Sequence, residues 1–156
     1  MIERIKIKIN FFAEFWDQYP IVDISIDSIK ISTHIINERY HSIENTVDLE
    51  MDKSHLLQIH RYNKSDDQCR IIDGEKKDQY IILKNLLIDG IDIQNLIWSR
   101  SWYEPQYPES WAKEQTQAGI DLESKVLGET WLSHNGIWNF QFSSPVYNFI
   151  ISQFRD

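Results

Sequence analysis

The first part of the chain alternates apolar and polar residues. Residues 5–11 read Ile-Lys-Ile-Lys-Ile-Asn-Phe, and the same two-residue period returns over residues 22–27 and 29–32. Successive side chains of a β-strand point to opposite faces of its sheet, so this period predicts strands with one buried face. Tyr19-Pro20 separates the first two segments, as expected for a break between strands.

Further strands are expected over four segments at intervals of about ten residues: 43–49, 55–62, 80–88 and 91–93. The third of these is almost continuously apolar, which is typical of a central strand. Residues 63–78 are polar and contain Asp73-Gly74, so a long loop is expected there. Strands that follow one another without long amphipathic helices between them indicate an antiparallel sandwich.

Two short helices are predicted late in the chain, near 108–118 and 145–154. Pro108 suits the first turn of the earlier helix, and Gly119 suits the position that ends it. Ser144-Pro145 suits the N-cap and first turn of the later helix. That helix carries one apolar stripe, which must pack on its own sandwich or on a neighbouring subunit: Tyr147, Ile150, Ile151 and Phe154.

Residues 125–132 and 137–142 also have the character of strands. His134-Asn135-Gly136 lies between them. Asn-Gly is favoured in tight hairpin turns, so we expect these two strands to pair with each other.

Together these patterns predict a mainly β protein, an antiparallel jelly-roll-like β-sandwich with two short helices. Its length is that of one domain, over residues 1–156. Within it, residues 1–93 form the sheet scaffold, and residues 94–156 form an aromatic-rich extension that ends in the C-terminal helix.

The candidate functional residues come from this extension, because five of the six tryptophans lie between positions 98 and 138. Large aromatic side chains fill a core, anchor a protein interface, or stack on a flat ligand such as a sugar ring, and the sequence leaves all three open. The candidates for a ligand site or an interface are Trp98, Trp102, Tyr103, Glu104, Tyr107, Trp111, Trp131 and Trp138.

Composition narrows the class of partner. The formal net charge of −8 argues against nucleic acid, since proteins that bind a phosphate backbone concentrate Lys and Arg. The lone Cys69 allows no disulfide within the chain. The N-terminal residues lack the apolar core of a signal peptide, and no segment reaches transmembrane length. We therefore expect no membrane partner, and a protein that stays in the cytoplasm where it is made, leaves by lysis or ends up inside a particle.

Catalytic signatures are weak. No serine stands in a Gly-x-Ser-x-Gly turn, and no pair of histidines has a metal-binding spacing. Glu104 and Glu109 lie among the aromatic residues, where a glycosidase would hold its two carboxylates. Acidic residues at this density are usually surface residues, so binding is predicted rather than catalysis.

The polar loop over residues 63–78 suggests one metal, calcium, which prefers hard oxygen ligands at irregular loop spacing. Its candidate ligands are Asn63, Asp73 and Asp78. A solvated acidic loop without any ion is the alternative, and no other cofactor is predicted.

A resemblance adds to this interpretation. The order of strands and turns from residue 20 to residue 93 resembles the calcium-dependent xylan-binding type of carbohydrate-binding module. The segments that carry it are 21–28, 52–59, Asn63, 78–83 and 87–90. The resemblance implies a jelly-roll sandwich that binds sugar hydroxyls through a loop-held Ca²⁺. This sequence departs from the family at Asn63-Lys64, where the family has Asn-Asp.

The second half resembles uncharacterised virion-associated proteins of tailed phages. The segments behind this are 102–108, 134–138 and 143–147. The predicted function is therefore a non-catalytic structural or attachment component of a phage particle, which contacts other virion subunits or copies of itself. The alternative is a free carbohydrate-binding module that recognises a polysaccharide.

Overall fold

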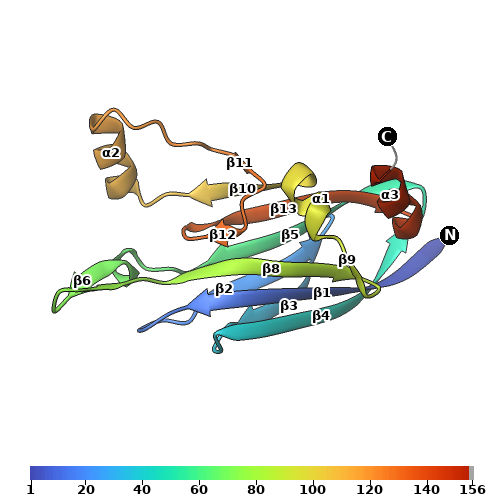
Figure 1. The fold of residues 1–156 in the computed structure, drawn as a ribbon, viewed down its shortest axis with the longest axis horizontal. Helices are drawn as coiled ribbons and strands as arrows, with labels where there is room; N and C mark the ends of the chain where they lie inside the picture. Colours follow the sequence, from blue (N-terminus) through green and yellow to red (C-terminus); the bar gives the residue numbers. More distant parts are fainter. Residues whose placement is uncertain (155–156) are drawn as a thin grey trace.

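The computed structural model describes residues 1–154, and the last two residues of the predicted domain lie outside the described part. Two antiparallel sheets face each other (Figure 1). The first contains, in spatial order, β12 (Trp131–Leu132), β8 (Tyr80–Ile88), β1 (Ile2–Glu14) and β4 (Tyr40–Glu50), and β9 (Ile91–Asp92) also pairs with β8. The second contains β11 (Val126–Leu127), β10 (Ser101–Gln106), β13 (Asn135–Ser144), β5 (Lys53–Tyr62), β2 (Ile21–Ile26) and β3 (Ile29–Ile35).

The alternating segments form strands for the reason that the pattern suggests. In β1, Ile5, Ile7 and Ile9 are buried, while Lys6 and Lys8 point to solvent. All seven segments predicted before residue 94 coincide with strands. The prediction of a mainly β, antiparallel sandwich is confirmed.

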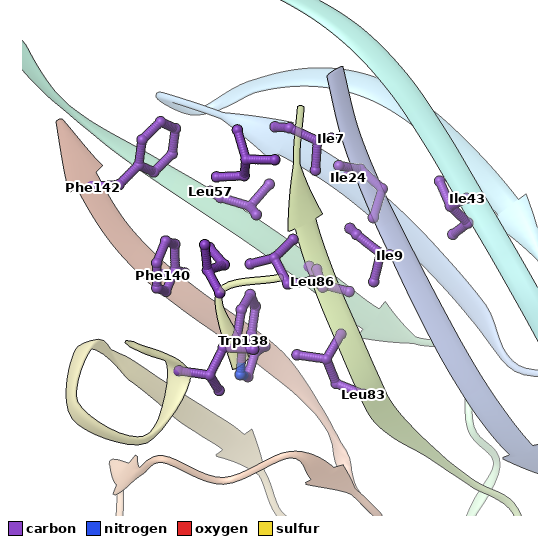
Figure 2. Packing of buried hydrophobic residues seen from close by; sticks show 14 of the residues in the cluster. Ile7, Ile9, Ile24, Ile43, Leu57, Leu83, Leu86, Trp138, Phe140 and Phe142 are labelled. Atoms are coloured by element: carbon purple, nitrogen blue, oxygen red, sulfur yellow. The ribbon is translucent and has the colours of Figure 1, made fainter. Parts of the chain in front are cut away.

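The core lies between the two sheets, where β13 contributes three aromatic rings (Figure 2). Trp138, Phe140 and Phe142 alternate along that strand, and their ring centroids are 6.1 and 6.0 Å apart. Isoleucines and leucines of the opposite sheet face them, including Ile7, Ile9, Leu83 and Leu86. These rings therefore fix the distance between the sheets.

The predicted hairpin across residues 134–136 is wrong. Asn135 and Gly136 lie inside β13, where they pair with Gln106 and Pro105 of β10. The segment expected as one strand over 125–132 is divided into β11 and β12, which belong to different sheets. Glycine is required at position 136 because the backbones of β10 and β13 approach each other closely there, and not because the chain turns. A Cβ at this position would lie 2.5 Å from the carbonyl oxygen of Glu104.

The loop over residues 63–78 has structure of its own. It contains a 3-10 turn over Asp66–Gln68 and a hairpin of β6 (Arg70–Ile72) with β7 (Glu75–Lys77). Gln68 is buried, and its side chain accepts a hydrogen bond from the Gln18 backbone N–H. This contact holds the loop against the segment that follows β1.

Both predicted helices are present, as α2 (Glu109–Gln117) and α3 (Val146–Gln153). Each proline precedes its helix instead of occupying the first turn. The predicted Ser144 cap is replaced by Glu3, whose carboxylate accepts bonds from the Ser144 hydroxyl and the Val146 N–H. A third helix, α1 (Gln94–Arg100), was not predicted. No helix in residues 1–154 is long and apolar enough to cross a membrane.

The helix α3 packs on its own sandwich, with a buried face that shares only Ile150 with the predicted stripe. Val146, Phe149 and Ile150 are buried, whereas Tyr147 and Phe154 are 63% and 60% exposed. The guanidinium of Arg100 on α1 covers the ring of Phe149 at 5.1 Å, so α1 and α3 contact each other at this end of the molecule.

Candidate functional site

Two of the predicted site residues belong to the core. Trp138 is fully buried and Tyr103 is 2% exposed, and they are opposite each other in the pairing of β10 with β13. The Tyr103 hydroxyl donates a hydrogen bond to the carbonyl oxygen of His134, and burial raises the pKa of this phenol. Both side chains therefore pack in the core.

Two others lie on separate surfaces. Trp98 is 61% exposed on α1. Trp102, on β10, packs under the ammonium of Lys125 at 4.5 Å and donates its indole N–H to Glu104. Glu104 is thus occupied by a structural contact, and neither tryptophan lines the cleft described below.

Tyr107 and Trp111 form an aromatic group with His134, which the sequence did not indicate. The ring centroid of His134 is 5.0 Å from that of Tyr107 and 4.9 Å from that of Trp111. Tyr107 is held in place because its hydroxyl donates to the carbonyl oxygen of Glu123 at 2.7 Å. Helix α2 carries Trp111, so the position of the group depends on how α2 is placed.

A cleft of about 500 Å³ lies between α2 and the loop over residues 63–78. Figure 1 shows α2 and β6 projecting from the same end of the sandwich, away from α3 and the N-terminus. We call it the aromatic cleft, and its defining residues are Lys64, Asp78, Trp111, Trp131, Ser133 and His134. Trp131 is 51% exposed and packs on Tyr80 with ring centroids 5.0 Å apart. The cleft therefore has indole rings from two separate elements, α2 and β12.

The polar part of the cleft is built around Lys64. Its ammonium donates to Asp78 Oδ1 at 3.0 Å and to the Ser133 carbonyl oxygen at 2.7 Å. Its side chain is only 12% exposed. Burial lowers the pKa of Lys64, and the bond to Asp78 opposes that shift. Asn135 fixes the backbone, since it accepts from the Lys64 N–H and donates to the Lys64 carbonyl.

A second cation, Arg61, lies in the interior nearby. It is fully buried and donates to the backbone and side-chain oxygens of Gln79, at 3.0 and 2.8 Å. Its Nε has no partner within residues 1–154, and burial lowers the pKa of the guanidinium to about 10. Burial also lowers the pKa of His134, and Lys64 and Arg61 add to that effect. These effects all favour the neutral form of the His134 ring, which lies beside Trp111.

The predicted calcium ligands do not form a site. Asp73 lies in the turn of the β6–β7 hairpin, and the whole of β7 lies between it and Asp78. Asp78 is paired with an ammonium group. In residues 1–154, no group of three or more His, Cys, Asp or Glu side chains is arranged to hold a metal ion. The residues present therefore do not fit a calcium ion.

Comparison with known proteins shows the fold. No protein-family model matches the chain, and no curated protein matches it. The structure of vCBM60 in complex with galactobiose is similar with a TM-score of 0.53 and 10% sequence identity, over 86% of this chain and 96% of that chain. The selenomethionine form of vCBM60, described with two families of calcium-dependent carbohydrate binding modules, has a TM-score of 0.49 and 9% identity, over 87% and 89% of the two chains. At these identities the first likeness establishes a sandwich of the same type as a carbohydrate-binding module.

Proposed function

We propose that the protein is a non-catalytic carbohydrate-binding module, and that the aromatic cleft is its binding site. The observation that carries the proposal is the pair of indole rings of Trp111 and Trp131 in one cleft. The polar groups around Lys64 line the same cleft. Flat aromatic rings stack on the apolar faces of sugar rings, while charged and hydroxyl groups bind the sugar hydroxyls. A volume of about 500 Å³ falls in the usual range for small-ligand sites.

The fold supports the proposal independently of the cleft. A protein with the same type of sandwich, vCBM60, has been crystallised with galactobiose. Short oligosaccharides of neutral sugars, galactobiose among them, are therefore the first ligands to test.

The test uses tryptophans inside and outside the cleft. The wild-type protein is screened on a glycan array, and glycans that bind are measured by calorimetry with Trp111→Ala, Trp131→Ala and Trp98→Ala. Each cleft variant should lose at least about tenfold in affinity, because a stacked indole is an energetically dominant contact. Trp98→Ala is the matched control, since Trp98 is also an exposed tryptophan but lies on α1, outside the cleft. If no glycan on the array binds, or if all three variants lose affinity equally, the proposal is refuted.

A second candidate function is an assembly subunit of a phage particle. It is favoured by exposed apolar side chains on α1, β11 and α3, namely Trp98, Leu127, Tyr147 and Phe154. Aromatic residues on an open surface are typical anchors of protein interfaces. In that case light scattering should show self-association, and Tyr147→Ser together with Phe154→Ser should abolish it. If the protein is a monomer at all concentrations, self-association is excluded, and only contacts with other virion subunits remain as a role in assembly.

A further inference from the structure

The ammonium of Lys64 is the central charge of the aromatic cleft. It is held at two oxygen atoms, a carboxylate oxygen of Asp78 and the carbonyl oxygen of Ser133. Carboxylate and backbone carbonyl oxygens are also the ligands that calcium prefers in loops. The two oxygens that a divalent ion could use here are thus already occupied by a cation that belongs to the chain.

A calcium ion could not be added beside this ammonium at low cost. Two positive charges a few ångströms apart repel strongly in a partly buried site. Arg61 adds a further buried positive charge, and its guanidinium donates to Gln79 and Asn135 and to no carboxylate within residues 1–154. The negative charge of Asp78 is therefore neutralised by the ammonium of Lys64, without any metal ion.

We infer that Lys64 takes the place of a metal ion in the aromatic cleft, and that its ammonium binds a sugar hydroxyl oxygen directly. An ammonium group has three donors, and two are used by Asp78 and Ser133. The third remains for a ligand that stacks on Trp111 or Trp131. The part of this inference that concerns the glycan rests on the proposed function, whereas independence from calcium does not.

The first experiment measures calcium and needs no glycan. The full-length protein is titrated with CaCl₂ by calorimetry and melted in excess CaCl₂ and in EDTA. The expected result is no binding heat and the same melting temperature in both solutions. Stoichiometric binding with a higher melting temperature in CaCl₂ would overturn the inference, because a ligand specific for the folded state stabilises it.

Substitutions at Lys64 test whether its ammonium lies in a cation position. Lys64→Asp should lower the melting temperature in EDTA, because two carboxylates then face each other. Calcium at about a hundred times its dissociation constant should raise that temperature again by at least roughly 5 °C. Lys64→Met is the control, as it removes the ammonium without adding a ligand, and it should stay insensitive to calcium. An Asp variant that folds but ignores calcium would count against the inference, and Lys64→Asn provides the same test should the Asp variant fail to fold.

The glycan part is tested by repeating the array in EDTA. Glycans bound by the wild-type protein should remain bound in EDTA, and Lys64→Met should lose them by about tenfold or more. Loss of binding in EDTA with the wild-type protein would overturn the inference while leaving the proposed function intact. If no glycan binds at all, the proposed function fails, and the calcium titration together with the Lys64 substitutions still decides whether Lys64 replaces the metal.

Discussion

Trp131 and Trp138 are close in the sequence but lie in opposite environments. Trp138 is fully buried and Trp131 is 51% exposed. The difference follows from their strands. β13 lies between β10 and β5, so its alternate residues face the opposite sheet, while β12 is a two-residue strand at the edge of the first sheet. The same residue type thus serves stability in the middle of a sheet and is available for binding at its edge.

The largest expected effect is on stability, and it should distinguish the buried Trp138 from the exposed Trp131. Trp138→Ala removes a ring from the sealed core and should lower the free energy of unfolding by about 3–5 kcal/mol, measured by urea denaturation. Trp131→Ala should cost no more than about 1 kcal/mol, because half of that ring already contacts water. Equal losses in the two variants would show that the edge strand is as important for folding as the core strand.

Gly136→Ala should be the next most damaging change. The added Cβ would lie 2.5 Å from the Glu104 carbonyl oxygen and 2.9 Å from the Pro105 Cα, and both are backbone atoms that cannot turn aside. We expect a loss of about 1–3 kcal/mol in urea denaturation. Gly74→Ala is a control at a turn without crowding, where only the positive φ opposes the substitution. A harmless Gly136→Ala would mean that β10 and β13 are not so closely paired.

At the end opposite to the aromatic cleft, Glu3→Gln should weaken the attachment of α3. The carboxylate accepts from the Val146 N–H at the start of that helix, where negative charge is stabilising. The expected cost is about 1 kcal/mol in the unfolding free energy. The affinity for glycans should not change, since α3 lies at the end of the sandwich opposite to α2 and β6 (Figure 1), and residues of α2 line the aromatic cleft.

The smallest expected effect is on the pH dependence of the unfolding free energy. Burial lowers the pKa of His134 below its ordinary value of 6.5, so the unfolded chain takes up a proton before the folded protein does. The stability contributed by neutral His134 is therefore complete above pH 6.5 and is lost as pH falls from 6.5 towards the folded-state pKa. His134→Gln should flatten this part of the profile in urea denaturation at pH 7.5 and 5.5. An unchanged slope would assign the dependence to other groups, such as His34, whose pKa burial also lowers.

Local patterns predicted the strands before residue 94 well but missed α1 and β10. α1 has only seven residues, of which two are buried, so it shows no helical periodicity. β10 contains Pro105, which cannot donate to a ladder, and its partners come from residues 135–140. The hairpin prediction failed for a related reason, since Gly136 is required by contact with β10, a segment distant in sequence.

The sequence alone determined the class of fold and indicated a region for the candidate site, because a two-residue period and a cluster of tryptophans are local properties of the chain. It could not determine which rings are buried, because that depends on whether a strand lies inside a sheet or at its edge. Nor could it show that Lys64, Asp78 and Ser133 meet, since these residues are joined by the packing of separate loops. The sequence placed Lys64 where the similar family has Asp, but only the tertiary structure showed that its ammonium is bonded to Asp78 and Ser133.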